Sequence, residues 1–158
     1  MKGTAIDMLL GVAVGDALGV PYEFSSREEM VKNPAKEMVG YRTHKQPPGT
    51  WSDDSSLTFC LAQSLVHGYS LETTALKFIN WRNVAYWTVR NEVFDIGITT
   101  NRAISRLASI LRDGNLENLK LLKYEAEEFD NGNGSLMRIL PLIFEIKGKS
   151  IKSQFDMT

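Results

Sequence analysis

Apolar residues recur at helical spacing along most of this 158-residue chain. In the first segment Met8, Leu9 and Val12 follow a period of three to four residues, and Pro21 ends the pattern. Small residues, glycine or alanine, alternate over positions 11–19, and each glycine costs a helix about 1 kcal/mol relative to alanine. The sequence therefore predicts an N-terminal helix that packs closely against another backbone or lines a site.

The same period predicts several further helices. The next begins with Ser52 or Asp53 as its N-cap, and Gly68 stands where a C-terminal glycine belongs. Its apolar positions are Leu57, Leu61 and Leu65, and a further helix after Ser70 has Ala75, Phe78, Ile79 and Trp81. A helix capped by Thr99 or Thr100 and ended by Gly114 has Ile104, Leu107, Ala108 and Leu111, and the next has Leu116, Leu119, Leu122 and Ala126. A last helix is expected over 136–146, with a kink at Pro141. No alternating strand pattern exceeds four residues. The sequence thus predicts an all-α fold.

Two connections break this regular pattern. Residues 25–50 are irregular apart from a short helix expected over 27–32, and their proline-rich end at 46–50 predicts a rigid, extended approach to the next helix. No element is predicted between Asn83 and Ile98. Long irregular connections are uncommon in a compact domain unless they are functional.

Composition excludes several classes of protein. The 18 basic and 19 acidic residues give a formal net charge of −1, and no run of five like charges occurs, so a nucleic-acid duplex is not an expected partner. The only cysteine, Cys60, lies in an apolar stretch and is expected in the core. The uninterrupted apolar runs are far shorter than the roughly 18 residues of a membrane span, so we expect no membrane partner and a cytoplasmic protein.

Polar residues interrupt the periodic pattern in a first segment, 15–23. Asp16 falls late in the small-residue helix, and Glu23 follows the backbone turn fixed by Pro21. One interpretation is that both acids belong to a functional site. The other is that Asp16 accepts hydrogen bonds from backbone amides at the end of a neighbouring helix, while Glu23 is simply exposed.

A second polar segment is Ser52-Asp53-Asp54. Acids at a helix start satisfy free N–H groups and the helix dipole, which explains one aspartate well but two less well, because neighbouring like charges repel. A hard divalent cation would remove that repulsion, and Mg²⁺ takes oxygen ligands of this kind. Capping and metal binding both stay open on the pattern alone.

The third polar segment runs from Asn131 through Asn133 and Gly134 to Ser135. Two glycines before an expected helix N-terminus expose backbone N–H groups that suit an anion such as a phosphate. No Gly-Lys-Ser/Thr follows, so the segment is not a P-loop. A plain turn with an N-cap explains the same residues.

Taken together, four blocks in order resemble the ADP-ribosylglycohydrolase family, which includes the dinitrogenase reductase-activating glycohydrolases. The blocks are Gly-Asp-Ala-Leu-Gly-Val-Pro-x-Glu, Trp-Ser-Asp-Asp-Ser-Ser-Leu-Thr, Asp-Ile-Gly-x-Thr-Thr-x-Arg-Ala and Asn-Gly-Ser-Leu-Met-Arg-Ile-Leu-Pro-Leu, spread over 8–142. The resemblance implies an all-α orthogonal helical bundle with a two-ion Mg²⁺ (or Mn²⁺) site in a central cleft.

The resemblance also implies roles for individual residues. Ser52, Asp53 and Asp54 match the family's metal ligands, and Glu23 matches the acid that contacts the metal or its water and assists hydrolysis. Asp95 matches an acid that faces the substrate. The residues Asn133, Gly134 and Ser135 fall in the block that approaches the ADP-ribose. The implied reaction is attack of a metal-activated water on the anomeric carbon, with the developing positive charge offset by nearby acids.

One departure bears on activity. Family members are roughly twice this length, and their second half brings an Asp-x-Asp-Ser/Thr motif that completes the metal site, whereas Glu145 and Asp156 here lack that spacing. We therefore expect residues 1–158 to be the N-terminal portion of one truncated domain, with an incomplete two-ion site. The expected partner is an ADP-ribosylated protein (on arginine or serine) or a small ADP-ribose derivative.

Two further expectations follow from an incomplete bundle. The stripes Leu57/Leu61/Leu65 and Ile104/Leu107/Leu111 should not both be covered, which predicts self-association through an exposed apolar face. The alternative function is that of a non-catalytic member of the family, a helical binding or structural module. The paired acids favour the hydrolase, whereas the missing second motif favours the module.

Overall fold

The protein is all-α in this computed structural model, which describes residues 4–125 and 132–158. The helices are α1 Ala5–Gly19, α2 Arg27–Lys32, α3 Asp53–Ser64, α4 Leu71–Val84, α5 Ile98–Asp113, α6 Asn118–Leu121, α7 Leu142–Ile146 and α8 Ile151–Met157. Short 3₁₀ turns cover Val20–Tyr22, Leu65–His67, Leu122–Tyr124 and Leu136–Arg138. No strand occurs in these two described ranges, as the sequence predicts.

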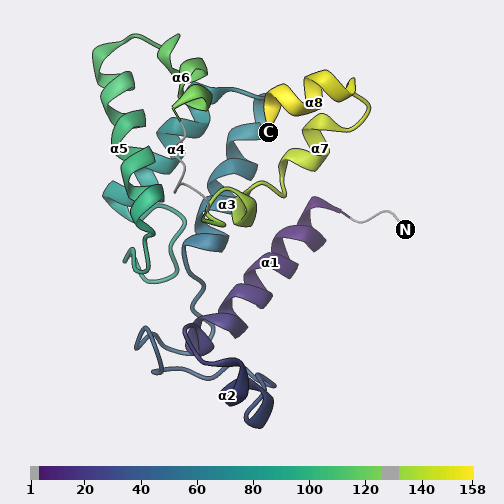
Figure 1. Cartoon of the computed structure of the whole chain (residues 1–158), viewed down its shortest axis with the longest axis vertical. Coiled ribbons are helices and arrows are strands. Elements are labelled where there is room, and N and C mark those ends of the chain that lie inside the picture. Colours follow the sequence, from purple (N-terminus) through teal and green to yellow (C-terminus); the bar gives the residue numbers. More distant parts are fainter. Residues whose placement is uncertain (1–3, 126–131) are drawn as a thin grey trace.

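Helix α3 is the centre of the molecule. It packs against α1 on one side and against α4 on the other, and α4 in turn packs against α5 (Figure 1). The core forms where α3, α4 and α5 meet. It is built around Leu57, Cys60, Trp81 and Ile104, which are all at most 1% exposed. Cys60 is thus a core residue, as expected, and burial raises the pKa of its thiol to about 12.

The predicted starts of α3 and α4 are confirmed. Ser52 is the N-cap of α3 and accepts a hydrogen bond from the Asp54 amide, while Ser70 does the same for α4 through the Thr73 amide. Helix α3 ends at Ser64, and the following 3₁₀ turn closes at Gly68 with φ +97°. Glycine adopts that conformation without steric cost, which explains its place there.

Three other predictions about helices were wrong. Helix α5 begins two or three residues earlier than predicted, with Gly97 as its N-cap, so neither Thr99 nor Thr100 is the cap. The helix expected from Leu116 is short: up to residue 125 it consists of α6 and the 3₁₀ turn Leu122–Tyr124, and Ala126 lies outside the described residues. The expected helix over 136–146 is a 3₁₀ turn and then α7, separated at Pro141, which is the N-cap of α7. Proline lacks the N–H that an unbroken helix needs at this point.

The apolar surface also differs from the expectation. The two stripes named from the sequence are covered: Leu57, Leu61 and Ile104 are buried, and the remaining members are half-buried. The exposed apolar residues lie elsewhere, most regularly on α1, where Ile6, Leu10 and Val14 are 66%, 59% and 54% exposed. Residues spaced by four share one face of a helix, so this face of α1 is apolar and open.

Helix α1 corrects one further expectation. Together with the following turn, residues 5–22 are long and apolar enough to cross a membrane by length and composition, contrary to the sequence-based prediction. In this structure the helix carries Asp16, whose carboxylate bonds to the start of α3. The segment contacts α3 here, and 17% of it is buried.

Candidate functional site

Asp16 fixes the N-terminus of α3 and with it the start of the site. Its carboxylate accepts hydrogen bonds from the amide and hydroxyl of Ser52 at 2.8–3.1 Å and from those of Ser55 at 2.6–2.9 Å. The first-turn N–H groups of a helix have no intrahelical acceptor, so an anion here is stabilising. The interpretation of Asp16 as an acceptor for a neighbouring helix end is confirmed.

Two further acids follow directly in the first turn of α3. Asp53 is 8% exposed and Asp54 is half-buried. Burial, followed by repulsion from Asp54 and Asp95, raises the pKa of Asp53 to about 7. Burial, followed by repulsion from Asp16, Glu23 and Asp95, raises the pKa of Asp54 to about 6. Because Ser52 and Asp16 already cap the helix, capping does not account for these two acids.

Glu23 and Asp95 meet around a histidine. His44 Nε2 lies 2.5 Å from Glu23 Oε2 and 3.9 Å from Asp95 Oδ2. The imidazole is 14% exposed, and the two carboxylates are 37% and 28% exposed. Burial raises the pKa of Glu23, a hydrogen bond to His44 opposes that rise, and repulsion from Asp95 adds to it. Glu23 is therefore not the simply exposed residue of the second interpretation.

Aromatic contacts position the loop that carries Asp95. Trp51 Nε1 donates to the Trp87 carbonyl at 3.1 Å, and Trp87 Nε1 donates to Gln63 Oε1 at 3.1 Å. Phe59 on α3 packs edge-on against both indole rings. These contacts fasten residues 85–97 to α3, and Asp95 itself adopts φ +54°, a left-handed conformation that aspartate tolerates better than most residues.

Arg138 supplies a positive charge that acts on Asp53 and Asp54. Burial lowers the pKa of its guanidinium, while Asp53 and Asp54 oppose that shift. Its Nη2 donates to Thr100 Oγ1 at 3.3 Å, and the guanidinium lies 5.5 Å from the centre of the Phe78 ring. The side chain is thus held by α5 and α4 at a place where its charge acts on α3.

The loop with Asn133, Gly134 and Ser135 lies beside Arg138. A Cβ atom on Gly134 would sit 2.9 Å from Thr100 Oγ1 and 3.1 Å from Arg138 Nη2, so only glycine fits without displacing them. Ser135 makes no capping hydrogen bond and is followed by a three-residue 3₁₀ turn instead of the expected helix. The helix N-terminus expected to bind an anion is therefore not formed; Asn131 lies outside the described residues.

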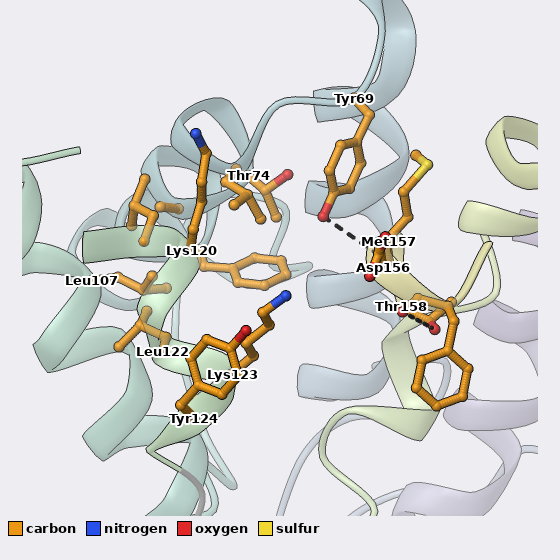
Figure 2. Close-up of a pocket in the computed structure, with 15 residues that line it drawn as sticks. Tyr69, Thr74, Leu107, Lys120, Leu122, Lys123, Tyr124, Asp156, Met157 and Thr158 are labelled. Carbon is orange, nitrogen blue, oxygen red and sulfur yellow. Dashed lines mark hydrogen bonds between the residues drawn. The ribbon is translucent and has the colours of Figure 1, made fainter. Parts of the chain in front are cut away.

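A cavity of about 460 Å³ opens onto the acids, and its lining includes Asp16, Glu23, Ser52, Asp54 and Met137. A larger cavity of about 890 Å³ lies between α4, α5, α6 and α8 (Figure 2). Its walls are mostly apolar, with Lys120 and Lys123 on one side and Tyr69 bonded to the Met157 carbonyl on the other. Three of the carboxylates, those of Asp16, Glu23 and Asp54, line the smaller cavity, which makes that cavity the candidate site.

Comparison with known proteins gives the same assignment as the motifs. The family model for ADP-ribosylglycohydrolase matches residues 2–155. The chain belongs to the ADP-ribosylglycohydrolase family. It is 30% identical over 155 residues to ADP-ribosylarginine hydrolase Tri1 of Serratia proteamaculans, covering 93% of this chain and 37% of that protein. It is 30% identical over 139 residues to ADP-ribosyl-[dinitrogen reductase] glycohydrolase of Rhodospirillum rubrum, covering 87% of this chain and 42% of that protein.

The fold agrees with the family. A solved ADP-ribosylglycohydrolase-related protein complex has a chain that superposes with a TM-score of 0.63 at 32% identity, covering 85% of this chain and 40% of the other. The chain thus spans 37–42% of the length of these relatives. The relatives carry segments that have no counterpart among these 158 residues.

The acids at the start of α3 suit a hard divalent cation, as expected for an ADP-ribosylglycohydrolase. Within residues 4–125 and 132–158, no hydrogen bond to a side-chain oxygen of Asp53 or Asp54 and no ion pair with either is recorded. Carboxylate oxygens that are not taken up by protein donors in this part of the chain are the ligands that Mg²⁺ prefers. The Ser52 hydroxyl donates a hydrogen bond to the Asp16 carboxylate and accepts one from the Asp54 amide, so one lone pair of its oxygen is left for an ion.

The structure brings the sequence-predicted residues together unevenly. Glu23 and Asp95 are neighbours, and both act electrostatically on Asp54. The loop lies one step further away: Gly134 lies against Arg138, whose charge acts on Asp53 and Asp54, and the Asn133 carbonyl accepts from the Met137 amide. Sequence reasoning missed His44. The available signal was that the chain has only two histidines, one of them next to the proline-rich approach to Trp51.

Proposed function

We propose that this chain is the N-terminal portion of a hydrolase that cleaves the glycosidic bond between ADP-ribose and an acceptor. The observation that supports the proposal is the pair of adjacent acids at the start of α3, Asp53 at 8% exposed and Asp54 half-buried, whose pKa values are raised by burial and by neighbouring acids that include Glu23 and Asp95. Membership of the ADP-ribosylglycohydrolase family gives that acid cluster its reaction class.

Asp53, Asp54 and Ser52 would hold Mg²⁺ or Mn²⁺, and the ion would supply Lewis-acid polarisation of substrate oxygens and of water. Glu23 accepts the proton of the attacking water, because its raised pKa brings the carboxylate closer to the operating range of a general base. Asp95 faces the anomeric carbon and offsets the positive charge that develops there as the bond to the acceptor breaks.

The loop at Asn133, Gly134 and Ser135 is proposed to approach the ADP-ribose. Its close packing on Thr100 and Arg138 holds the backbone at a fixed distance from α3. A substrate held between this loop and the acids would have its reacting atoms oriented, and orientation is a large part of the catalytic effect in reactions of this kind.

Arginine is the first acceptor to test, because one relative is named as an ADP-ribosylarginine hydrolase. The test is ADP-ribose release from ADP-ribosylated arginine, with ADP-ribosylated serine and small ADP-ribose derivatives beside it, by this chain completed with the segment its relatives carry. Release in Mg²⁺ or Mn²⁺ that is lost in both Asp53→Ala and Asp54→Ala supports the proposal. A completed protein that binds the metal but releases nothing from any of these substrates supports the non-catalytic module.

A further inference from the structure

We propose that Phe24 and Tyr41 form a docking surface for the polypeptide that carries the ADP-ribosyl group, and that this surface selects apolar residues beside the modified one. The proposal rests on the hydrolase function proposed above, because it concerns the acceptor in that reaction. The two aromatic side chains are 81% and 71% exposed. Phe24 follows Glu23 directly, and Tyr41 lies in the loop that carries His44, so both border the candidate site.

The backbone distinguishes these two residues from other exposed apolar ones. Phe24 has φ +61° and Tyr41 has φ +60°, in the left-handed region that bulky side chains rarely adopt. Within the described part of the chain, Trp87 is the only other exposed large apolar residue with a positive φ. All three lie outside the helices. Backbone strain of this kind persists where the surrounding structure holds it, and it is concentrated at functional sites.

Two contacts place the loop of Tyr41 against the segment of Phe24. Thr43 Oγ1 donates to the carbonyl of Glu23 at 2.8 Å. The ring of His44 lies beside that of Phe24, with 6.0 Å between the ring centres. The two exposed rings therefore stand on adjacent segments at one rim of the site.

The loop that carries Tyr41 is also closed by its own contacts. The Tyr41 amide donates to the Gln46 carbonyl at 2.7 Å. A Cβ on Gly40 would lie 2.5 Å from Pro48 Cδ, so the absence of a side chain lets the loop fold back on its proline end. The position of the Tyr41 backbone is thus fixed before any partner binds, which lowers the entropy cost of binding.

A cation adjoins the two rings. The Arg42 guanidinium lies 4.6 Å from the centre of the Tyr22 ring, and Tyr22 lines the cavity onto which the acids open. A guanidinium over an aromatic face keeps its in-plane N–H donors free. No ion pair of Arg42 is recorded within residues 4–125 and 132–158. Arg42 can therefore donate to backbone carbonyls of a polypeptide that lies on the rings.

The place of these residues suits the acceptor. The bond that breaks joins the anomeric carbon to the acceptor, and the acids surround that carbon, so a polypeptide acceptor must leave the cavity across its rim. Exposed aromatic side chains bury a large area at a low cost in conformational entropy, and together with arginine they are enriched in protein interfaces. Free ADP-ribosylarginine has no flanking residues to place on Phe24 and Tyr41.

The experiment compares substrates that differ only beyond the modified arginine. They are free ADP-ribosylarginine, a peptide with leucine on both sides of an ADP-ribosylated arginine, and the same peptide with glycine on both sides. The ratio kcat/KM is measured for each with the completed protein and with its Phe24→Gly, Tyr41→Gly and double variants. Phe155→Ala is the matched control, because Phe155 is an 83% exposed ring on α8 outside the candidate site.

We expect the wild type to prefer the leucine-flanked peptide over the glycine-flanked one by about tenfold, because the leucines bury apolar area on the rings. Each single glycine variant should reduce this preference, the double variant should abolish it, and Phe155→Ala should keep it. Glycine adopts a left-handed backbone without strain, so the variants should unfold at urea concentrations no lower than the wild type does. Their loss of preference is then separate from any loss of folding.

Equal kcat/KM of the wild type for the two peptides would overturn the proposal, and so would a preference that survives in the folded double variant. If the completed protein hydrolyses none of the substrates, fluorescence anisotropy gives the dissociation constants of both peptides instead. A leucine preference that depends on Phe24 and Tyr41 would then support the docking surface although the hydrolase proposal had failed. Binding without that preference, or no binding, would overturn the docking surface as well.

Discussion

A single carboxylate, Asp16, connects the first helix to the site. It accepts hydrogen bonds from two amides and two hydroxyls of Ser52 and Ser55, so it holds α1 and the start of α3 together. The polar interruption of an apolar helix was visible in the sequence. Its partner was not, because 36 residues separate Asp16 from Ser52 and no local pattern pairs them.

We predict that Asp16→Ala lowers the free energy of unfolding by about 2–4 kcal/mol, since it removes a charged acceptor shared by four donors at a helix start. Urea unfolding followed by circular dichroism measures the change. Asp156→Asn, at an exposed position on α8, is the control and should change stability by less than about 0.5 kcal/mol. Equal stability of Asp16→Ala and wild type would show that the contact contributes little.

The raised pKa values of Asp53 and Asp54 predict how the stability of the metal-free chain depends on pH. Their folded pKa values of about 7 and about 6 lie above the ordinary 3.8, so between pH 4 and 7 the folded chain binds more protons than the unfolded one. The free energy of unfolding contributed by these groups is therefore highest in acid and falls as pH rises through that window. Urea unfolding in a chelator at pH 5 and pH 7.5 measures it.

Asp53→Asn is the control for that prediction, because it removes the larger shift. The variant should lose less stability between pH 5 and pH 7.5 than the wild type does. A wild-type chain whose stability rises over this range as much as that of the variant would contradict the assignment of a raised pKa to Asp53.

At the scale of elements, the N-terminal helix, the short helix over 27–32 and the starts of α3 and α4 are confirmed, whereas the start of α5 and the helices expected after Leu116 differ from the prediction. Helices α3 and α4 begin at serines that bond to their first turns. The N-cap of α5 is Gly97, which has no side chain that could form a capping hydrogen bond and so mark the start of the helix in the sequence. After Pro141 the apolar residues continue at helical spacing, but the missing N–H ends the regular hydrogen bonding, so one predicted helix becomes a turn and a short helix.

A substitution at Gly134 tests how the loop of Asn133, Gly134 and Ser135, proposed to approach the ADP-ribose, is held in place. Gly134→Ala places a Cβ within 2.9–3.1 Å of Thr100 Oγ1 and Arg138 Nη2, so the loop or Arg138 must move. We predict that this variant lowers kcat/KM for the ADP-ribosyl substrate, and so raises KM relative to kcat, in the completed protein by about tenfold or more, because misplacement of about 1 Å can cost about a hundredfold in rate. Gly132→Ala is the control, since a Cβ there meets nothing within 4 Å. Equal kcat/KM values for the two variants would contradict a close-packed loop.

The open apolar face of α1 bears on association. Ile6, Leu10 and Val14 are each more than half exposed along one side of the helix. We expect the isolated chain to self-associate at micromolar concentration through this face, and Leu10→Glu to shift it toward the monomer. Light scattering measures the mass, with Val31→Glu on α2 as a control of equal charge at an exposed apolar position. A wild-type chain that is monomeric at tens of micromolar would refute the expectation.

For the whole molecule, the sequence was sufficient to predict an all-α fold, the family and the acids at the start of α3. Motif blocks and capping residues are local, and they can be recognised without knowing what they touch. The surroundings of Glu23 could not be predicted in this way, because His44 and Asp95 reach it from two irregular loops without periodicity. The covering of the apolar stripes was mispredicted for a related reason: the length of a chain does not say which of its faces pack.

The relative lengths also predict the strength of metal binding. The chain matches only 37–42% of its relatives, and the resemblance places further acidic ligands in the part beyond the match. We therefore expect Asp53 and Asp54 of the isolated chain to bind Mg²⁺ weakly, with most ligand positions filled by water. Calorimetry measures this affinity. Micromolar or tighter binding of Mg²⁺ by the 158 residues alone would show that these residues already supply a complete site.

The central claim is that this chain carries half of a hydrolytic site, and the most direct test compares ADP-ribose release by the isolated chain and by the chain completed in cis or as a second polypeptide. With ADP-ribosylated arginine and Mg²⁺, we expect little or no release by the isolated chain and turnover by the completed protein, because catalysis requires both sets of ligands to hold the reactants in register. Asp53→Ala and Asp54→Ala should abolish that turnover. Efficient hydrolysis by the isolated chain, or full activity of the completed Asp53→Ala variant, would contradict the account.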